Sequence, residues 1–305
     1  MPNNEILLDN EIKKLLAEKP FLAYIMKYCI KEYEHEEIDT IMKDYIEPHI
    51  RISMDHVHGE RIIGSRNENN EDEERVTFDI AFEASLPQQK DRIGLRVNIE
   101  LQSTEPPYSL VNRGHYYNAR QLSSQKGSFF IKSNYDDLLK VYSIWIVICP
   151  RKEKQNSIIR YHMVEEVLLG KGYEEEKNYN KQEIIMVYLS QEESGNRLIE
   201  LLKTVADRTM ESEKKISILE KEYGIEINER IEKEVNSMCN YSQLIKEEGR
   251  SEGILLGEAK GRHMLFTSIC SLMENLKIDM PEAMRLLNIP KKDHQMFREM
   301  MKSNS

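Results

Sequence analysis

The chain has 305 residues, and its 53 acidic against 43 Lys and Arg residues give a formal net charge of -10. This length can bury a sizeable core and predicts one main domain with an appendage. The negative charge excludes a protein that coats nucleic acid through bulk charge, so any DNA contact must be local. The four widely spaced cysteines argue against a zinc ribbon or a disulfide framework and fit a reducing cytoplasm. The longest apolar stretch is too short to span a bilayer, so no membrane role is expected.

The N-terminal part of the chain has a helical pattern over residues 11–47, punctuated by Pro20 and Pro48. Residues 49–58 are then expected to form a strand. The following segment, Gly59 to Glu74, is rich in acids, and this composition predicts a solvated loop.

Two segments of alternating polarity follow the acidic loop. From Val76 to Ala84, apolar residues occupy one face and Asp79 lies on the other. After a short turn the alternation returns, and Glu100 and Gln102 share its polar face. Paired as a hairpin, these strands would place Asp79 and Glu100 on the same face of a sheet, with Gln102 one pleat further along.

The rest of the core alternates between helical and strand patterns. A helix is expected from about Ser109 to Gln125, and the apolar run from Lys140 to Cys149 predicts a central strand. Further strands are expected at 157–165 and 183–189. This order predicts an α/β core that ends near residue 190.

The C-terminal third has a different composition. Residues 195–262 are dominated by Glu, Lys, Arg, Ile and Leu without proline, which predicts long charged helices that could pair in a homodimer. Gly249, Gly253, Gly257 and Gly261 recur at a spacing of four; contact with a partner helix and simple flexibility both explain them. Residues 264–302 are expected to form two or three short helices, broken at 277–281 and 288–290.

The predicted hairpin carries the chemistry that the sequence suggests most strongly. Two neighbouring carboxylates, Asp79 and Glu100, need a cation, and such an oxygen site suits Mg²⁺ or Mn²⁺. The alternative is a polar strand face that simply contacts solvent, and spacing alone favours this second interpretation.

Longer motifs add a family resemblance. Val76-Thr-Phe-Asp79-Ile and Val97-Asn-Ile-Glu100-Leu-Gln102 resemble the active-site hairpin of the PD-(D/E)XK nuclease-family transposases, which are related to recombination-promoting nucleases. Arg113-Gly-His-Tyr-Tyr117, Tyr135-Asp-Asp137 and Lys140-Val-Tyr-Ser-Ile-Trp145 are similar to the segments that follow it.

The resemblance implies a restriction-endonuclease-like α/β fold, a mixed sheet flanked by helices, that cuts DNA with a metal held by Asp79 and Glu100. A Lys usually follows the Glu by two residues, but here Gln102 stands in its place and would orient the attacking water. An added acid from the first core helix is expected, with Glu37 as the candidate metal ligand and Glu47 as a spare. The implied division is N-terminal helices (1–48), nuclease core (49–192), long charged helices (193–262) and a small helical appendage (263–305).

A window without acids lies between Glu105 and Asp136. It combines cations with aromatic rings, the mixture that nucleic-acid grooves use. The candidate DNA-binding residues are Arg113, Tyr116, Tyr117, Arg120 and Lys126. Buried rings and solvated cations explain the same composition, so both interpretations stay open.

The leading hypothesis is a cytoplasmic bacterial Mg²⁺-dependent DNA endonuclease linked to transposition, recombination or mobile-element biology. The alternative is a catalytically silent scaffold that keeps the fold, binds nucleic acid or forms oligomers. Two weaker patterns are not favoured. Asp55-His56-Val57-His58 has no third soft ligand for zinc, and residues 264–302 lack the positive charge of a helix-turn-helix DNA reader.

Overall fold

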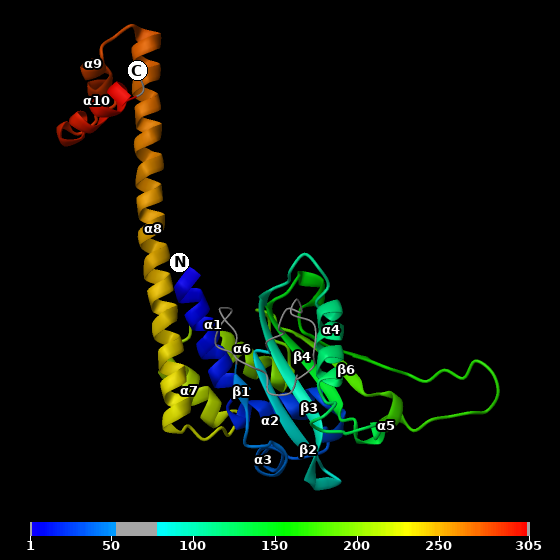
Figure 1. Ribbon diagram of the computed structural model, residues 1–305. Helices are drawn as coiled ribbons and strands as arrows, with labels where there is room; N and C mark the ends of the chain where they lie inside the picture. The colour runs from blue at the N-terminus through cyan, green and yellow to red at the C-terminus, as the bar shows by residue number, and fades with distance from the viewer. Residues whose placement is uncertain (1, 53–77, 304–305) are drawn as a thin grey trace. The chain divides into compact units, whose positions relative to one another are not determined.

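The computed structural model of the chain describes residues 2–52 and 78–303. Within these ranges the chain forms two compact units, Met1–Ser242 and Gln243–Ser305. The first unit is α/β, with a mixed sheet flanked by helices (Figure 1), as the sequence predicted. The second unit is helical.

The described part of the sheet has six strands. They are β1 (Arg51–Ile52), β2 (Ile80–Leu86), β3 (Gln89–Thr104), β4 (Lys140–Cys149), β5 (Ser157–His162) and β6 (Gln182–Tyr188), in the spatial order β1-β2-β3-β4-β6-β5. The first three strands pair antiparallel, β3, β4 and β6 run parallel, and β5 is an antiparallel edge strand. The predicted hairpin is confirmed as β2 and β3, and the predicted central strand as β4.

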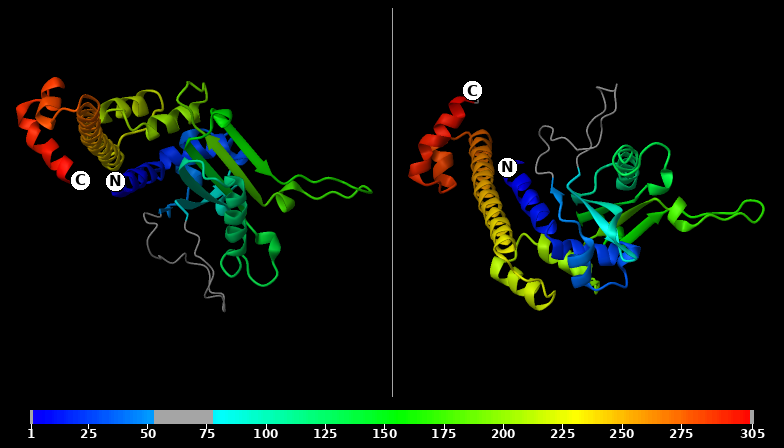
Figure 2. Two further views of the ribbon diagram at one scale, coloured as in Figure 1. Left: turned by 90° about the horizontal axis from the view of Figure 1, so that it is seen from above. Right: turned by 60° about the horizontal axis from the view of Figure 1, so that its bottom comes forward.

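Helix α4 (Leu110–Ser123) connects β3 to the parallel strand β4 and covers one face of the sheet (Figure 2). Gly114 lets the helix approach closely, because a Cβ there would lie 3.0 Å from Ile184 Cγ2 and 3.2 Å from Trp145 Nε1. Along β3, Arg96 and Asn98 project toward α4, since Arg96 Nη1 donates to Gln121 O at 3.3 Å. The predicted alternation of β3 is therefore confirmed.

The opposite face is covered by helices from both ends of the first unit (Figure 2). Helices α1 (Pro2–Leu16), α2 (Lys19–Cys29), α6 (Arg197–Ala206) and α7 (Ser212–Lys221) lie on this side. The Asn196 side chain caps α6 by accepting from Leu198 N at 3.0 Å and Ile199 N at 3.1 Å. Lys215 is fully buried and donates to Val205 O and Asp207 O, so it satisfies the C-terminal carbonyls of α6.

The domain boundary differs from the predicted one. Residues 193–242 belong to the first unit, because α6 buries its apolar face against α1 and α2. The sequence analysis assigned this region from its overall charged composition and did not detect the apolar face of the short helix α6.

Helix α8 (Glu229–Leu276) continues from the first unit into the second, which also contains α9 (Met280–Leu286) and α10 (His294–Ser303). The predicted breaks are confirmed, since Lys277 and Asn288 adopt φ values of 53° and 52°. None of the helices in the described ranges has the length and apolarity to cross a membrane. The remaining short elements are η1 (Lys31–Tyr33), α3 (Ile38–Thr40), η2 (Ile41–Tyr45), η3 (Tyr135–Asp137), η4 (Lys152–Lys154), α5 (Glu176–Tyr179) and η5 (Lys291–Asp293).

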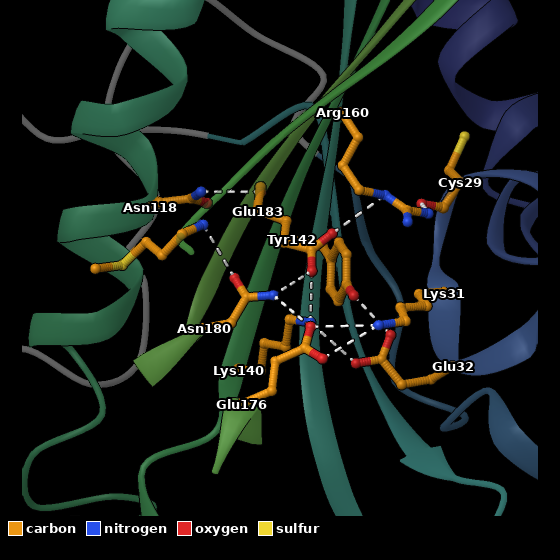
Figure 3. A network of polar contacts seen from close by, with 11 residues as sticks. Cys29, Lys31, Glu32, Asn118, Lys140, Tyr142, Arg160, Glu176, Asn180 and Glu183 are labelled. Carbon is orange, nitrogen blue, oxygen red and sulfur yellow. Dashed lines mark hydrogen bonds and ion pairs between the residues drawn. The ribbon is translucent and has the colours of Figure 1, made fainter. Parts of the chain in front are cut away.

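A buried polar network fixes η1 to the sheet (Figure 3). Its centre is Glu183, which is 1% exposed and lies 2.7 Å from Lys140 Nζ and 3.4 Å from Arg160 Nε. Lys140 also contacts Glu32 at 3.1 Å, and Asn180 Nδ2 donates to Glu183 at 2.8 Å. Every charge here has an opposite partner, so we interpret the network as structural.

Candidate active site

Asp79 and Glu100 meet at the start of β2. The antiparallel register places Ile80 opposite Ile99, so Asp79 lies opposite Glu100. Asp79 N donates to Glu100 Oε1 at 3.3 Å, and Leu101 N donates to Asp79 Oδ2 at 2.9 Å. The structure thus brings together Asp79 and Glu100, the two residues that the hairpin pattern predicted, and each carboxylate accepts a backbone N–H of the other strand.

The Glu100 carboxyl lies in the interior of the first unit and is 4% exposed. Burial raises its pKa well above the usual range, and the neighbouring Asp79 carboxylate adds to this effect. Asn98 Nδ2 donates to Glu100 Oε1 at 3.3 Å and to Ser143 Oγ at 3.1 Å, which fixes the orientation of the Asn98 amide. The Gln121 side chain from α4 donates to Asn98 Oδ1. Asn98, together with Ser143 and Gln121, therefore forms a hydrogen-bonded layer that orients the Glu100 carboxyl.

Lys13 is a site residue that the sequence analysis missed. Its Nζ lies 2.8 Å from Asp79 Oδ1, and the two side chains are 10% and 15% exposed. One turn earlier on α1, Asp9 accepts from Ser103 Oγ at 3.4 Å, so α1 follows the end of β3. No local pattern in residues 2–16 marks Lys13, because its role depends on a contact with a distant part of the chain.

Gln102 lies one pleat beyond Glu100 on β3, as predicted. Its Nε2 donates to Thr104 O at 2.8 Å, which directs the side chain along the strand. A neutral amide cannot accept the proton of an attacking water near neutral pH, so Gln102 can act only by hydrogen bonding.

Glu37 does not join the carboxylate pair. It is exposed and precedes α3. The segments around it contact the far end of β2, where Tyr33 OH donates to Ser85 O at 2.7 Å and Ile46 pairs with Ala84. The spare candidate Glu47 also lies at this end, since its backbone N donates to Glu83 O. The prediction that Glu37, or Glu47 as a spare, adds a ligand to the pair is therefore wrong; helix α1 contributes Lys13 to the site.

The candidate DNA-binding residues separate into inward and outward groups. Tyr117 is 6% exposed and its ring packs 5.4 Å from those of Phe78 and Trp145, so its predicted role in stacking on DNA is corrected to a core role. Arg113 donates to Tyr117 OH at 2.6 Å and lies over the Trp145 ring. Its positive charge is close enough to Glu100 to offset part of the rise in the pKa of Glu100. Tyr116 and Lys126 are exposed, and Arg120 is half-buried.

Other predicted features lie outside the described residues or form no cluster within them. His56, His58 and the acidic segment 59–74 belong to the range that is not described. In the ranges that are described, no group of three or more His, Cys, Asp or Glu side chains could hold a metal. A metal at the hairpin would have two protein carboxylates, with the other positions left to water and substrate oxygens.

The fold and the site define an α/β protein in which a buried Glu100 lies beside Asp79 in the β2–β3 hairpin. Comparison with models of known protein families, with curated proteins and with solved structures gives no match. The family resemblance therefore depends on the sequence motifs alone.

Proposed function

We propose that this chain is a metal-dependent nuclease of the PD-(D/E)XK type that hydrolyses phosphodiester bonds in DNA. The observation that carries the proposal is the place of Glu100, whose carboxyl is 4% exposed and accepts a hydrogen bond from the backbone N of Asp79 on the adjacent strand. Burial and the neighbouring Asp79 charge make Glu100 costly to ionise, and a bound cation would offset this cost. The mixed sheet with flanking helices also agrees with the fold that the sequence resemblance implies.

The residues present fit a Mg²⁺ or Mn²⁺ ion. One or two carboxylates, together with water and phosphate oxygens, are the ligands that Mg²⁺ takes in nucleotide-processing sites. Lys13 Nζ lies 2.8 Å from Asp79 Oδ1, so an ion that binds Asp79 would displace this ammonium group. When bound, the metal would supply Lewis-acid activation of the phosphate and of a water molecule.

The chain itself would contribute positioning and charge. Gln102 would hold the attacking water by hydrogen bonding, since its amide cannot serve as a base. Lys13 would neutralise charge beside Asp79, and Arg113, stacked on Trp145, would contact a phosphate oxygen near the carboxylates. The carboxylate pair and both cations lie where β3 approaches its C-terminal end.

The second candidate is a catalytically silent scaffold that binds nucleic acid, and the ion pair between Lys13 and Asp79 favours it. In this case Lys13 replaces the metal permanently, and Gln102 has no catalytic role. Under either function, a biological role in transposition, recombination or phage defence is compatible with the site.

Nicking of supercoiled plasmid by the purified chain separates the two functions. We expect nicking with Mg²⁺ or Mn²⁺, none with EDTA, and at least a hundredfold loss in Asp79→Asn and Glu100→Gln. Glu37→Gln serves as the matched control, because it removes an exposed acid outside the site and should cut like wild type. DNA binding without nicking by the wild-type protein would favour the scaffold.

A further inference from the structure

A small cavity lies where β3, β4 and β6 end and α4 begins. Its volume is about 270 Å³. The residues that concern its chemistry are Glu105, Tyr108, Arg151, Lys154, Tyr161 and Tyr188. None of them takes part in the carboxylate pair.

The charged groups of this cavity leave one cation exposed. Lys154 Nζ lies 2.6 Å from Glu105 Oε2 and 5.3 Å from the centre of the Tyr188 ring, so Lys154 is fixed in place. Arg151 uses its backbone N to donate to Glu105 Oε1 at 2.9 Å. Its side chain is exposed and forms no ion pair with any residue that the structure describes. Arg151 and Lys154 together outweigh the single carboxylate of Glu105, so the charged residues that line the cavity have a net positive charge.

Aromatic rings lie beside these cations. Tyr108 is 55% exposed and Tyr161 is 37% exposed, whereas Tyr188 is buried at the base. Exposed rings next to cations are the combination by which proteins bind single-stranded nucleic acid, because bases stack on the rings and phosphates contact the cations. A cavity of this size has room for an unpaired base.

The cavity lies within reach of a strand bound at the carboxylates. Glu105 follows Glu100 by five residues, and a strand rises about 3.3 Å per residue, so the two lie about 16 Å apart along β3. An extended nucleic-acid strand covers this distance in a few nucleotides. Both features also face the end of the sheet where α4 begins.

We propose that this cavity binds an unpaired nucleotide of the DNA strand that is cut. The base stacks on Tyr108, and Arg151 contacts the adjoining phosphate. The inference rests on the proposed function, because it specifies the substrate of the same site as DNA with a single-stranded segment beside the cut.

Fluorescence anisotropy in EDTA tests this binding apart from catalysis. The probes are a fluorescein-labelled single-stranded oligonucleotide and the duplex of the same sequence, and the protein is the full chain. We expect wild type to bind the single strand more tightly than the duplex. The double variant Tyr108→Ala/Arg151→Ala should weaken single-strand binding by about fivefold or more and change duplex binding less.

The matched control is Lys171→Ala/Tyr173→Ala, which removes a cation and a ring, both exposed, from the loop between β5 and β6. It should bind both probes as wild type does. Equal affinity for the two probes in wild type, or an unchanged single-strand affinity in the Tyr108 and Arg151 variant, would overturn the proposal. Loss of single-strand binding in that variant supports the cavity even where the plasmid assay detects no cutting, so the two proposals fail separately.

Discussion

Replacing Lys13 with Met leaves Asp79 without the ammonium group that lies 2.8 Å from its Oδ1. Unit charges at this distance attract each other by about 6 kcal/mol at an effective dielectric constant of about 20. Desolvation of the two groups offsets most of this attraction, so the intact pair contributes little net stability. Removal of one partner differs, because it leaves a largely buried carboxylate beside Glu100; the expected cost is about 3 kcal/mol.

Thermal unfolding in EDTA measures this cost. One kcal/mol corresponds to about 2–4 °C for units of this size, so Lys13→Met should unfold about 6–12 °C below wild type. Lys43→Met is the control for loss of a lysine ion pair at the surface. Lys43 lies 4.0 Å from Asp39 and the two side chains are 67% and 78% exposed, so its loss should cost about 0.5 kcal/mol or less. An unchanged melting temperature for Lys13→Met would refute the electrostatic argument.

The same variant also reports on the metal. A cation that binds only the native state raises its stability in proportion to the logarithm of its concentration over Kd. Because Met cannot compete for Asp79, Mn²⁺ should raise the melting temperature of Lys13→Met more than that of wild type. Equal Mn²⁺ shifts in the two proteins would show that the ion binds elsewhere.

Three further variants probe the surroundings of the site. The raised pKa of Glu100 means that the native state binds the carboxyl proton more tightly than the unfolded state does. The free energy of unfolding therefore falls as pH rises above the usual carboxyl range. In urea unfolding, Glu100→Gln should be as stable as wild type near pH 4 and more stable than wild type near pH 8. Gly114→Val should cost about 1–3 kcal/mol in the same assay, since a Cβ already meets Ile184 at 3.0 Å. Lys140→Met should cost about 3 kcal/mol by leaving Glu183 short of a cation, and the double variant Lys140→Met/Glu183→Gln should recover part of the loss.

Much of the first unit could be predicted from the sequence because its signals are local. The alternation of β3 fixed which of its side chains share a face, and the apolar run of β4 matched the observed strand, Lys140–Cys149. The contact between Asp79 and Glu100 followed from the same source, because a hairpin of adjacent strands determines its own register.

The remaining site residues depend on tertiary contacts. Lys13 reaches Asp79 only after α1 packs beside the end of β3, and composition within α1 does not indicate this. Glu37 was a candidate by its place in a helical segment, yet that segment contacts the far end of β2. Tyr117 shows that an aromatic residue on a helix has the same sequence signal whether it packs in a core or stacks on a base.

The central claim is that Asp79 and Glu100 together hold a divalent metal. Titration of the protein with Mn²⁺, followed by the electron paramagnetic resonance signal of the free ion, tests it directly. Wild type should bind Mn²⁺, whereas Asp79→Asn and Glu100→Gln should each lose that binding and Glu37→Gln should retain it. Equal Mn²⁺ binding by wild type and both site variants would contradict the account.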